Sequence, residues 1–96
     1  MTNEVSPEFW QRADEIIALA NKQAKECDVG KVSSSTLYAA ARYNAFNVIA
    51  SANDVEEMKN DKEEAIGYFV DQYQKMLTEN LDEYIKTYVK YKPHAK

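Results

Sequence analysis

The chain has 96 residues, of which 45% are hydrophobic and 29% charged, and it contains only two glycines and two prolines. This length suits one domain, and this composition excludes collagen-like and disordered classes. The formal net charge of -4 argues against a general nucleic-acid binder, because counterion release from a nucleic acid requires clustered Lys and Arg.

The N-terminal segment MTNEVSPEF has no basic stretch followed by an apolar run, so we expect no secretory signal. Arg42 interrupts the longest apolar stretch, so we also expect no membrane span. The single cysteine, Cys27, cannot form an intramolecular disulfide, which suits a reducing compartment. We therefore predict a soluble, cytoplasmic protein.

The first predicted helix covers about residues 7–27. Ser6 is a good N-cap residue, and Pro7 suits the first helical position. Steps of three and four residues then place the apolar side chains on one face. The members of this face are Phe9, Trp10, Ala13, Ile16, Ile17, Ala20, Ala24 and Cys27.

The second predicted helix covers about residues 34–52, with a cap supplied by one of the three serines at 33–35. Its apolar residues lie on most sides, which is typical of a central helix contacted from several directions. Its many alanines would permit close approach of neighbouring helices.

The third predicted helix covers about residues 62–91, after a possible short helical turn at 55–59. Asp54 with Glu57, and Asp61 with Glu64, both have the spacing of a capping box. At 1.5 Å per residue, this helix would be about 45 Å long, against roughly 30 Å for the other two. We expect an all-α three-helix bundle with flexible ends.

The overlong end of the third helix is rich in large apolar side chains. An exposed patch of this kind usually marks an interface, so we predict a homodimer or a higher homo-oligomer. The predicted interface residues are Tyr84, Ile85, Tyr88, Val89 and Tyr91.

Two polar residues, Arg42 and Asn44, stand within the apolar segment LYAAARYNAF of the second helix. With Tyr73 they could line a ligand pocket, because Arg presents a fork of donors and Asn both donates and accepts. The more ordinary interpretation is structural: Asn44 bonds a neighbouring helix, and Arg42 pairs with an acid such as Asp71 or Asp82.

Signs of catalysis or of a bound cofactor are missing from the sequence. The only histidine, His94, has no partner at metal-ligand spacing, so we predict no metal and no cofactor. Cys27 fits an apolar helix face better than a nucleophile's environment. The lysines of KTYVKYKPHAK suit a helix C-terminus, so we predict no nucleic-acid or membrane partner.

Three segments resemble the DUF3144 family of short proteobacterial helical proteins. They are PEFWQRADEIIALAN, GKVSSSTLYAAARYNAF and DKEEAIGYFVDQYQKMLTENLDEYI, which together cover most of the chain. The resemblance implies a small bacterial all-helical protein and transfers no activity and no functional residues.

Two functional hypotheses follow from these features. The first is a non-catalytic, homo-oligomeric protein-interaction or regulatory module, based on the apolar second helix and the aromatic end of the third. The alternative is a small-molecule-binding helical bundle that uses Arg42, Asn44 and Tyr73. No catalytic signature supports an enzyme.

Overall fold

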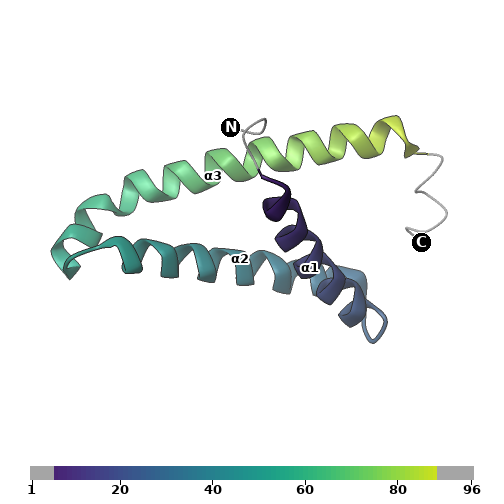
Figure 1. The fold of residues 1–96 in the computed structure, drawn as a ribbon, viewed down its shortest axis with the longest axis horizontal. Helices are drawn as coiled ribbons and strands as arrows, with labels where there is room; N and C mark the ends of the chain where they lie inside the picture. Colours follow the sequence, from purple (N-terminus) through teal and green to yellow (C-terminus); the bar gives the residue numbers. More distant parts are fainter. Residues whose placement is uncertain (1–5, 89–96) are drawn as a thin grey trace. The chain divides into compact units, whose positions relative to one another are not determined.

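The computed structural model describes residues 6–88 and contains three α-helices (Figure 1). They are α1 (Pro7–Ala24), α2 (Val29–Ser51) and α3 (Val55–Lys86). No strand occurs within residues 6–88, so the predicted all-α class is confirmed. With 32 residues, α3 is much longer than α1 with 18 and α2 with 23, as predicted.

Helix α1 begins where the capping signal predicted. The backbone N–H of Phe9 donates to the Ser6 hydroxyl at 3.3 Å, and Pro7 occupies the first turn. The helix ends at Ala24, three residues earlier than predicted, with a tight turn in which the N–H of Glu26 donates to the Gln23 carbonyl. Because α1 ends early, residues 25–28 form the connection that leads into the next helix.

Helix α2 begins at Val29, five residues before the predicted start. The Asp28 carbonyl accepts from the N–H groups of Lys31 and Val32, so the helix is already formed before the serine run. The three serines therefore lie inside the helix and do not cap it. Just beyond them, the Thr36 hydroxyl donates to the Val32 carbonyl at 2.7 Å.

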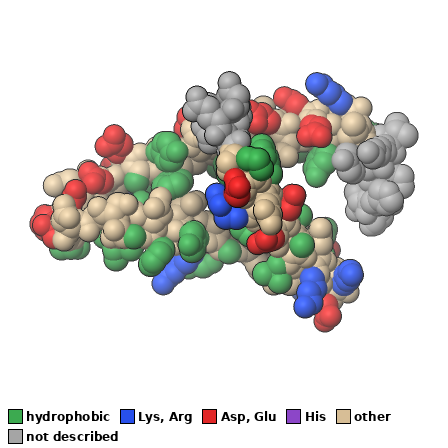
Figure 2. All heavy atoms as spheres, viewed as in Figure 1, with side chains coloured by type: hydrophobic (Ala, Val, Ile, Leu, Met, Phe, Trp, Pro, Cys, Tyr) green, Lys and Arg blue, Asp and Glu red, His purple; other side chains and the backbone are tan. Residues whose placement is uncertain are grey.

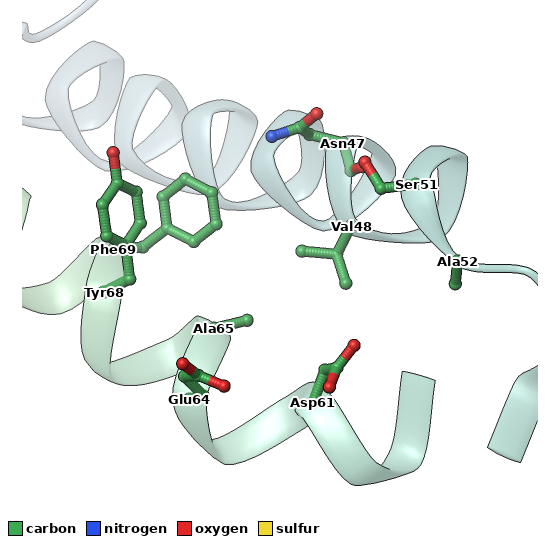
Figure 3. Close-up of a pocket in the computed structure, with 9 residues that line it drawn as sticks. All are labelled: Asn47, Val48, Ser51, Ala52, Asp61, Glu64, Ala65, Tyr68 and Phe69. Carbon is green, nitrogen blue, oxygen red and sulfur yellow. The ribbon is translucent and has the colours of Figure 1, made fainter. Parts of the chain in front are cut away.

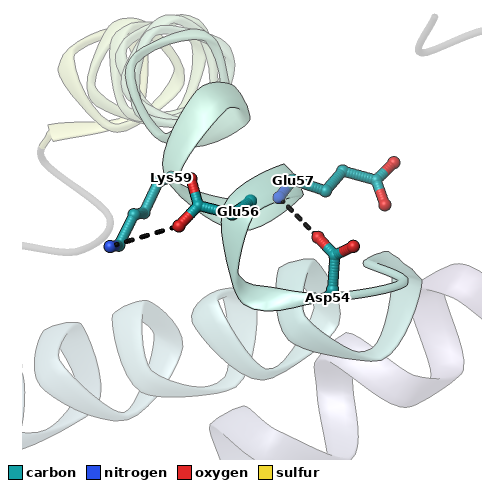
Figure 4. Close-up of polar contacts among 4 residues, drawn as sticks. All are labelled: Asp54, Glu56, Glu57 and Lys59. Atoms are coloured by element: carbon teal, nitrogen blue, oxygen red, sulfur yellow. Dashed lines mark hydrogen bonds and ion pairs between the residues drawn. The ribbon is translucent and has the colours of Figure 1, made fainter.

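Helix α3 begins at Val55 and not near Lys62, because the first of the two predicted caps is the one used. The N–H of Glu57 donates to Asp54 Oδ1 at 2.8 Å (Figure 4), and the Glu57 carboxylate accepts from the N–H of Asn53 at 2.8 Å. The predicted turn at 55–59 is thus the first turn of α3. The helix ends at Lys86, five residues before the predicted end.

The chain divides into two compact units, residues 1–46 and 47–96. In the described part, the first unit contains α1 and most of α2, and the second contains the end of α2 and all of α3. Helix α2 contacts α1 in the first unit and α3 in the second, which agrees with its predicted central place. That the chain forms a single domain stays a prediction.

Burial is sparse throughout the described residues. Val32, which is 6% exposed, is the only buried apolar side chain among them. On α1, the partly buried side chains are Phe9, Ala13, Ala20 and Ala24, all members of the predicted apolar face. Apart from buried Val32 and partly buried Val48, the large aromatic and aliphatic side chains of α2 are exposed, although its apolar pattern predicted burial on most sides. Hydrophobic side chains accordingly reach the surface among the charged ones (Figure 2).

Candidate functional site

A continuous row of exposed apolar side chains runs along α3 and includes Tyr88, two residues beyond its end, and we call it the α3 stripe. At about 100° per residue, the row occupies about 80° of the helix circumference. Each member is between 44% and 59% exposed. The members are Ile66, Val70, Tyr73, Leu77, Leu81, Tyr84 and Tyr88.

The stripe is exposed because the second unit offers little that could cover it. Apart from α3, the described part of this unit holds only the last turn of α2 and the connection to Val55. Those residues lie beside the first part of α3, where Ala65 and Phe69 are partly buried. From Ile66 to Tyr88 the stripe is about 33 Å long, well beyond the reach of one helical turn.

A shallow groove of about 360 Å³ lies between the end of α2 and the first half of α3 (Figure 3). Val48 points from α2 toward Ala65 of α3, so the floor is apolar. Two carboxylates, of Asp61 and Glu64, line the α3 side. The remaining lining residues are Asn47, Ser51, Ala52, Tyr68 and Phe69.

The groove continues into an acidic segment, residues 53–64. Six of its twelve residues are Asp or Glu and two are Lys, giving a formal net charge of -4. Part of this charge is locally balanced, because Lys59 Nζ lies 3.5 Å from Glu56 Oε2 (Figure 4). Asp54 and Glu57 take part in the cap of α3. Asp61 and Glu64 are the acids of this segment that line the groove.

The residues predicted for a ligand pocket lie in different units. Arg42 is exposed and Asn44 partly buried on the α2 portion of the first unit, whereas Tyr73, 47% exposed, belongs to the α3 stripe. None of the three is among the described residues that line the groove. Asp71 Oδ2, from one of the acids suggested for Arg42, lies 3.6 Å from Lys75 Nζ.

Of the predicted interface residues, three fall within the described part of the chain. Tyr84, Ile85 and Tyr88 are 51%, 69% and 57% exposed. Val89 and Tyr91 lie outside the described residues, as do the two predicted flexible ends. The groove was not predicted from the sequence, because its lining comes from two helices whose pairing is a property of the fold. The acidic run before Ala65 is the one sequence feature that coincides with it.

Other kinds of site find little support in residues 6–88. No three His, Cys, Asp or Glu side chains gather there as possible metal ligands. No helix in this part of the chain combines the length and apolar composition needed to cross a bilayer. Cys27 is exposed, and its Sγ lies 3.7 Å from the Gln23 carbonyl oxygen.

Comparison with known proteins identifies relatives but no activity. A family model described as "Protein of unknown function (DUF3144)" matches residues 9–85. The NMR structure of the protein NB7890A from Shewanella sp is similar, with 37% sequence identity and a TM-score of 0.75, over 96% of this chain and 98% of that one. No match was found among the curated proteins.

Proposed function

The chain belongs to the DUF3144 family of proteins of unknown function, and from its surface we propose that it is a non-catalytic interaction module that associates with copies of itself. The observation that carries this proposal is the α3 stripe. Monomeric proteins rarely expose contiguous apolar patches larger than a few hundred Å². The α3 stripe is a contiguous row of seven large apolar side chains about 33 Å long.

The energetics favour association through this stripe. Covering a half-exposed Leu, Ile or Tyr side chain contributes roughly 1 kcal/mol, about half the value for full burial. Seven such side chains on each of two chains would contribute roughly 14 kcal/mol, which is of the same order as the about 4–15 kcal/mol that association costs. The aromatic members suit an interface, since Tyr combines a large apolar ring with a hydroxyl that tolerates water.

The chemistry of the described surface supports a binding role more than a catalytic one. The groove holds two carboxylates but no histidine, thiol or hydroxyl arranged as a nucleophile with its base. An interaction or regulatory role requires only the apolar and charged surfaces already described. We place this role in the cytoplasm, a reducing compartment in which an exposed cysteine such as Cys27 remains a thiol.

A single charge placed in the middle of the stripe tests the proposal. We expect Leu77→Glu to weaken self-association at least tenfold, because a buried unpaired carboxylate costs more than the roughly 1.4 kcal/mol that this factor represents. Sedimentation equilibrium or light scattering on the intact chain measures the effect, and circular dichroism checks that the helices persist.

Thr78→Glu is the matched control. Thr78 is the next residue in the same helix, is exposed, and lies outside the stripe, so it receives the same charge without touching the proposed interface. The proposal is wrong if the wild-type chain has the mass of one copy at every concentration tested. It is also wrong if both substitutions change association equally.

A further inference from the structure

The spacing of the α3 stripe is the same in both directions along the helix. From Ile66 to Tyr88 its members follow one another at steps of 4, 3, 4, 4, 3 and 4 residues. These steps make two repeats of 11 residues, and a row with about 3.67 residues per turn runs nearly parallel to the helix axis. The spacing is symmetric about Leu77, the middle member of the stripe.

A two-fold axis through Leu77 therefore brings every member of the stripe opposite a member of a second, antiparallel copy. Leu77 itself lies opposite the partner's Leu77. Because the arrangement is two-fold symmetric, each of the other pairs occurs twice. These pairs are Ile66 with the partner's Tyr88, Val70 with the partner's Tyr84, and Tyr73 with the partner's Leu81.

The paired side chains also match in size. Each tyrosine of the stripe faces an aliphatic side chain of the other copy, and no two tyrosines face each other. Large side chains opposite smaller ones keep the distance between two helices even along their contact. A parallel copy would place each tyrosine against the same tyrosine of its partner and Val70 against the partner's Val70, so wide and narrow layers would alternate.

Charged side chains are absent from both borders of the stripe. Residues 66–88 contain six charged residues, and at about 100° per residue they all fall within about 120° of the helix circumference, centred opposite the stripe. A partner helix can therefore lie along the stripe without burying any of these charges. The six are Asp71, Lys75, Glu79, Asp82, Glu83 and Lys86.

The line of the stripe becomes charged before Ile66. Glu63 and Lys59 continue it toward the N-terminus at steps of three and four residues. Parallel copies would place Glu63 against the partner's Glu63, so like charges would meet on the contact line. In the antiparallel register the two Glu63 residues lie about 42 Å apart along the helices, at 1.5 Å per residue.

The area of the stripe suits a stable dimer. A fully exposed large apolar residue presents roughly 200 Å² to water, so seven residues that are about half exposed present about 700 Å² per copy. Covering both stripes would bury roughly 1,400 Å², within the range of about 1,200–2,000 Å² buried by specific, stable interfaces.

We infer that a second copy of this chain binds antiparallel along α3, on a two-fold axis through Leu77 that pairs each tyrosine of the stripe with an aliphatic side chain of the partner. This inference rests on the self-association proposed above and adds the direction, the register and the side-chain pairing of the contact. All of the paired residues lie between Ile66 and Tyr88.

Distances between spin labels on the full-length protein test the direction of the helices. Cys27→Ser removes the exposed thiol, and either Gly67→Cys or Thr78→Cys then introduces a single labelling site. At about 100° per residue, positions 67 and 78 lie within about 20° of each other on the helix circumference, outside the stripe. Both positions are exposed, and a Cβ atom at Gly67 has open space around it.

The two sites should give clearly different distances. In the antiparallel dimer, position 67 lies about 30 Å from its counterpart along the helices, whereas position 78 lies about 3 Å from its own. We expect the label distance at position 67 to exceed that at position 78 by roughly 15 Å, measured by pulsed electron paramagnetic resonance. Parallel helices would give nearly equal distances, and that result would overturn the antiparallel contact.

A third site, Ile85→Cys, tests the register. Ile85 lies at the same angle as Gly67 on the helix, and its separation from its counterpart along the helices is about 24 Å. The label distance at position 67 should therefore exceed that at position 85 by several Å. An equal or reversed order would place the axis at or before position 76 and overturn the pairing through Leu77.

Sedimentation equilibrium on each labelled variant checks that the dimer persists. If a label at position 67 weakened association, positions 78 and 85 would still differ by roughly 10 Å in the antiparallel dimer. A monomeric wild-type chain would overturn the proposed self-association, and the inference with it. A dimer that Leu77→Glu weakens but whose label distances are those of parallel helices would overturn the inference alone.

Discussion

At the scale of single residues, Val32 is distinguished from every other apolar side chain in residues 6–88, because it alone is buried. We expect Val32→Ala to lower the free energy of unfolding by about 1–2 kcal/mol, since two buried methyl groups are lost. Val29→Ala, at a position that is 65% exposed in the same helix, should change it by less than about 0.5 kcal/mol. Urea unfolding followed by circular dichroism measures both, and equal effects would contradict the assigned importance of Val32.

At the scale of helices, the start of α3 depends on which of two similar capping signals is used. Asp54 accepts a hydrogen bond from the Glu57 N–H, whereas Asp61 lies within the helix. We expect Asp54→Ala to cost about 1 kcal/mol and to lower the melting temperature by about 4–8 °C. Asp61→Ala removes the same charge and should lower it far less, so a larger loss from Asp61→Ala would contradict the observed cap.

At the scale of the whole molecule, the described chain exposes many more large apolar side chains than it buries. If copies associate through the α3 stripe, mass action makes thermal stability depend on protein concentration. We expect the melting temperature to rise by several degrees over about a hundredfold increase in concentration. Calorimetry measures this rise, which should be much smaller for Leu77→Glu, and a melting temperature independent of concentration would count against association.

Helices with strong local signals could be predicted from the amino-acid sequence. Ser6 and Pro7 marked the start of α1, and helical periodicity predicted the all-α class. The apolar spacing also predicted a long third helix, although α3 begins seven and ends five residues earlier than predicted. The resemblance to the DUF3144 family, drawn from three segments, was also confirmed. These features depend on residues close together in the sequence, so they could be predicted without the tertiary structure.

Two features depend on how the helices pack and could not be predicted in this way: which of several similar capping signals is used, and which apolar faces are covered. The serine run before Thr36 looked like a cap but lies inside α2, because the turn after α1 closes early enough for Asp28 to start the next helix. The groove near Asp61 and the exposure of the α3 stripe likewise depend on which helices lie side by side. Periodicity identifies a face that can be buried, but the presence of a partner for that face is a property of the packed molecule.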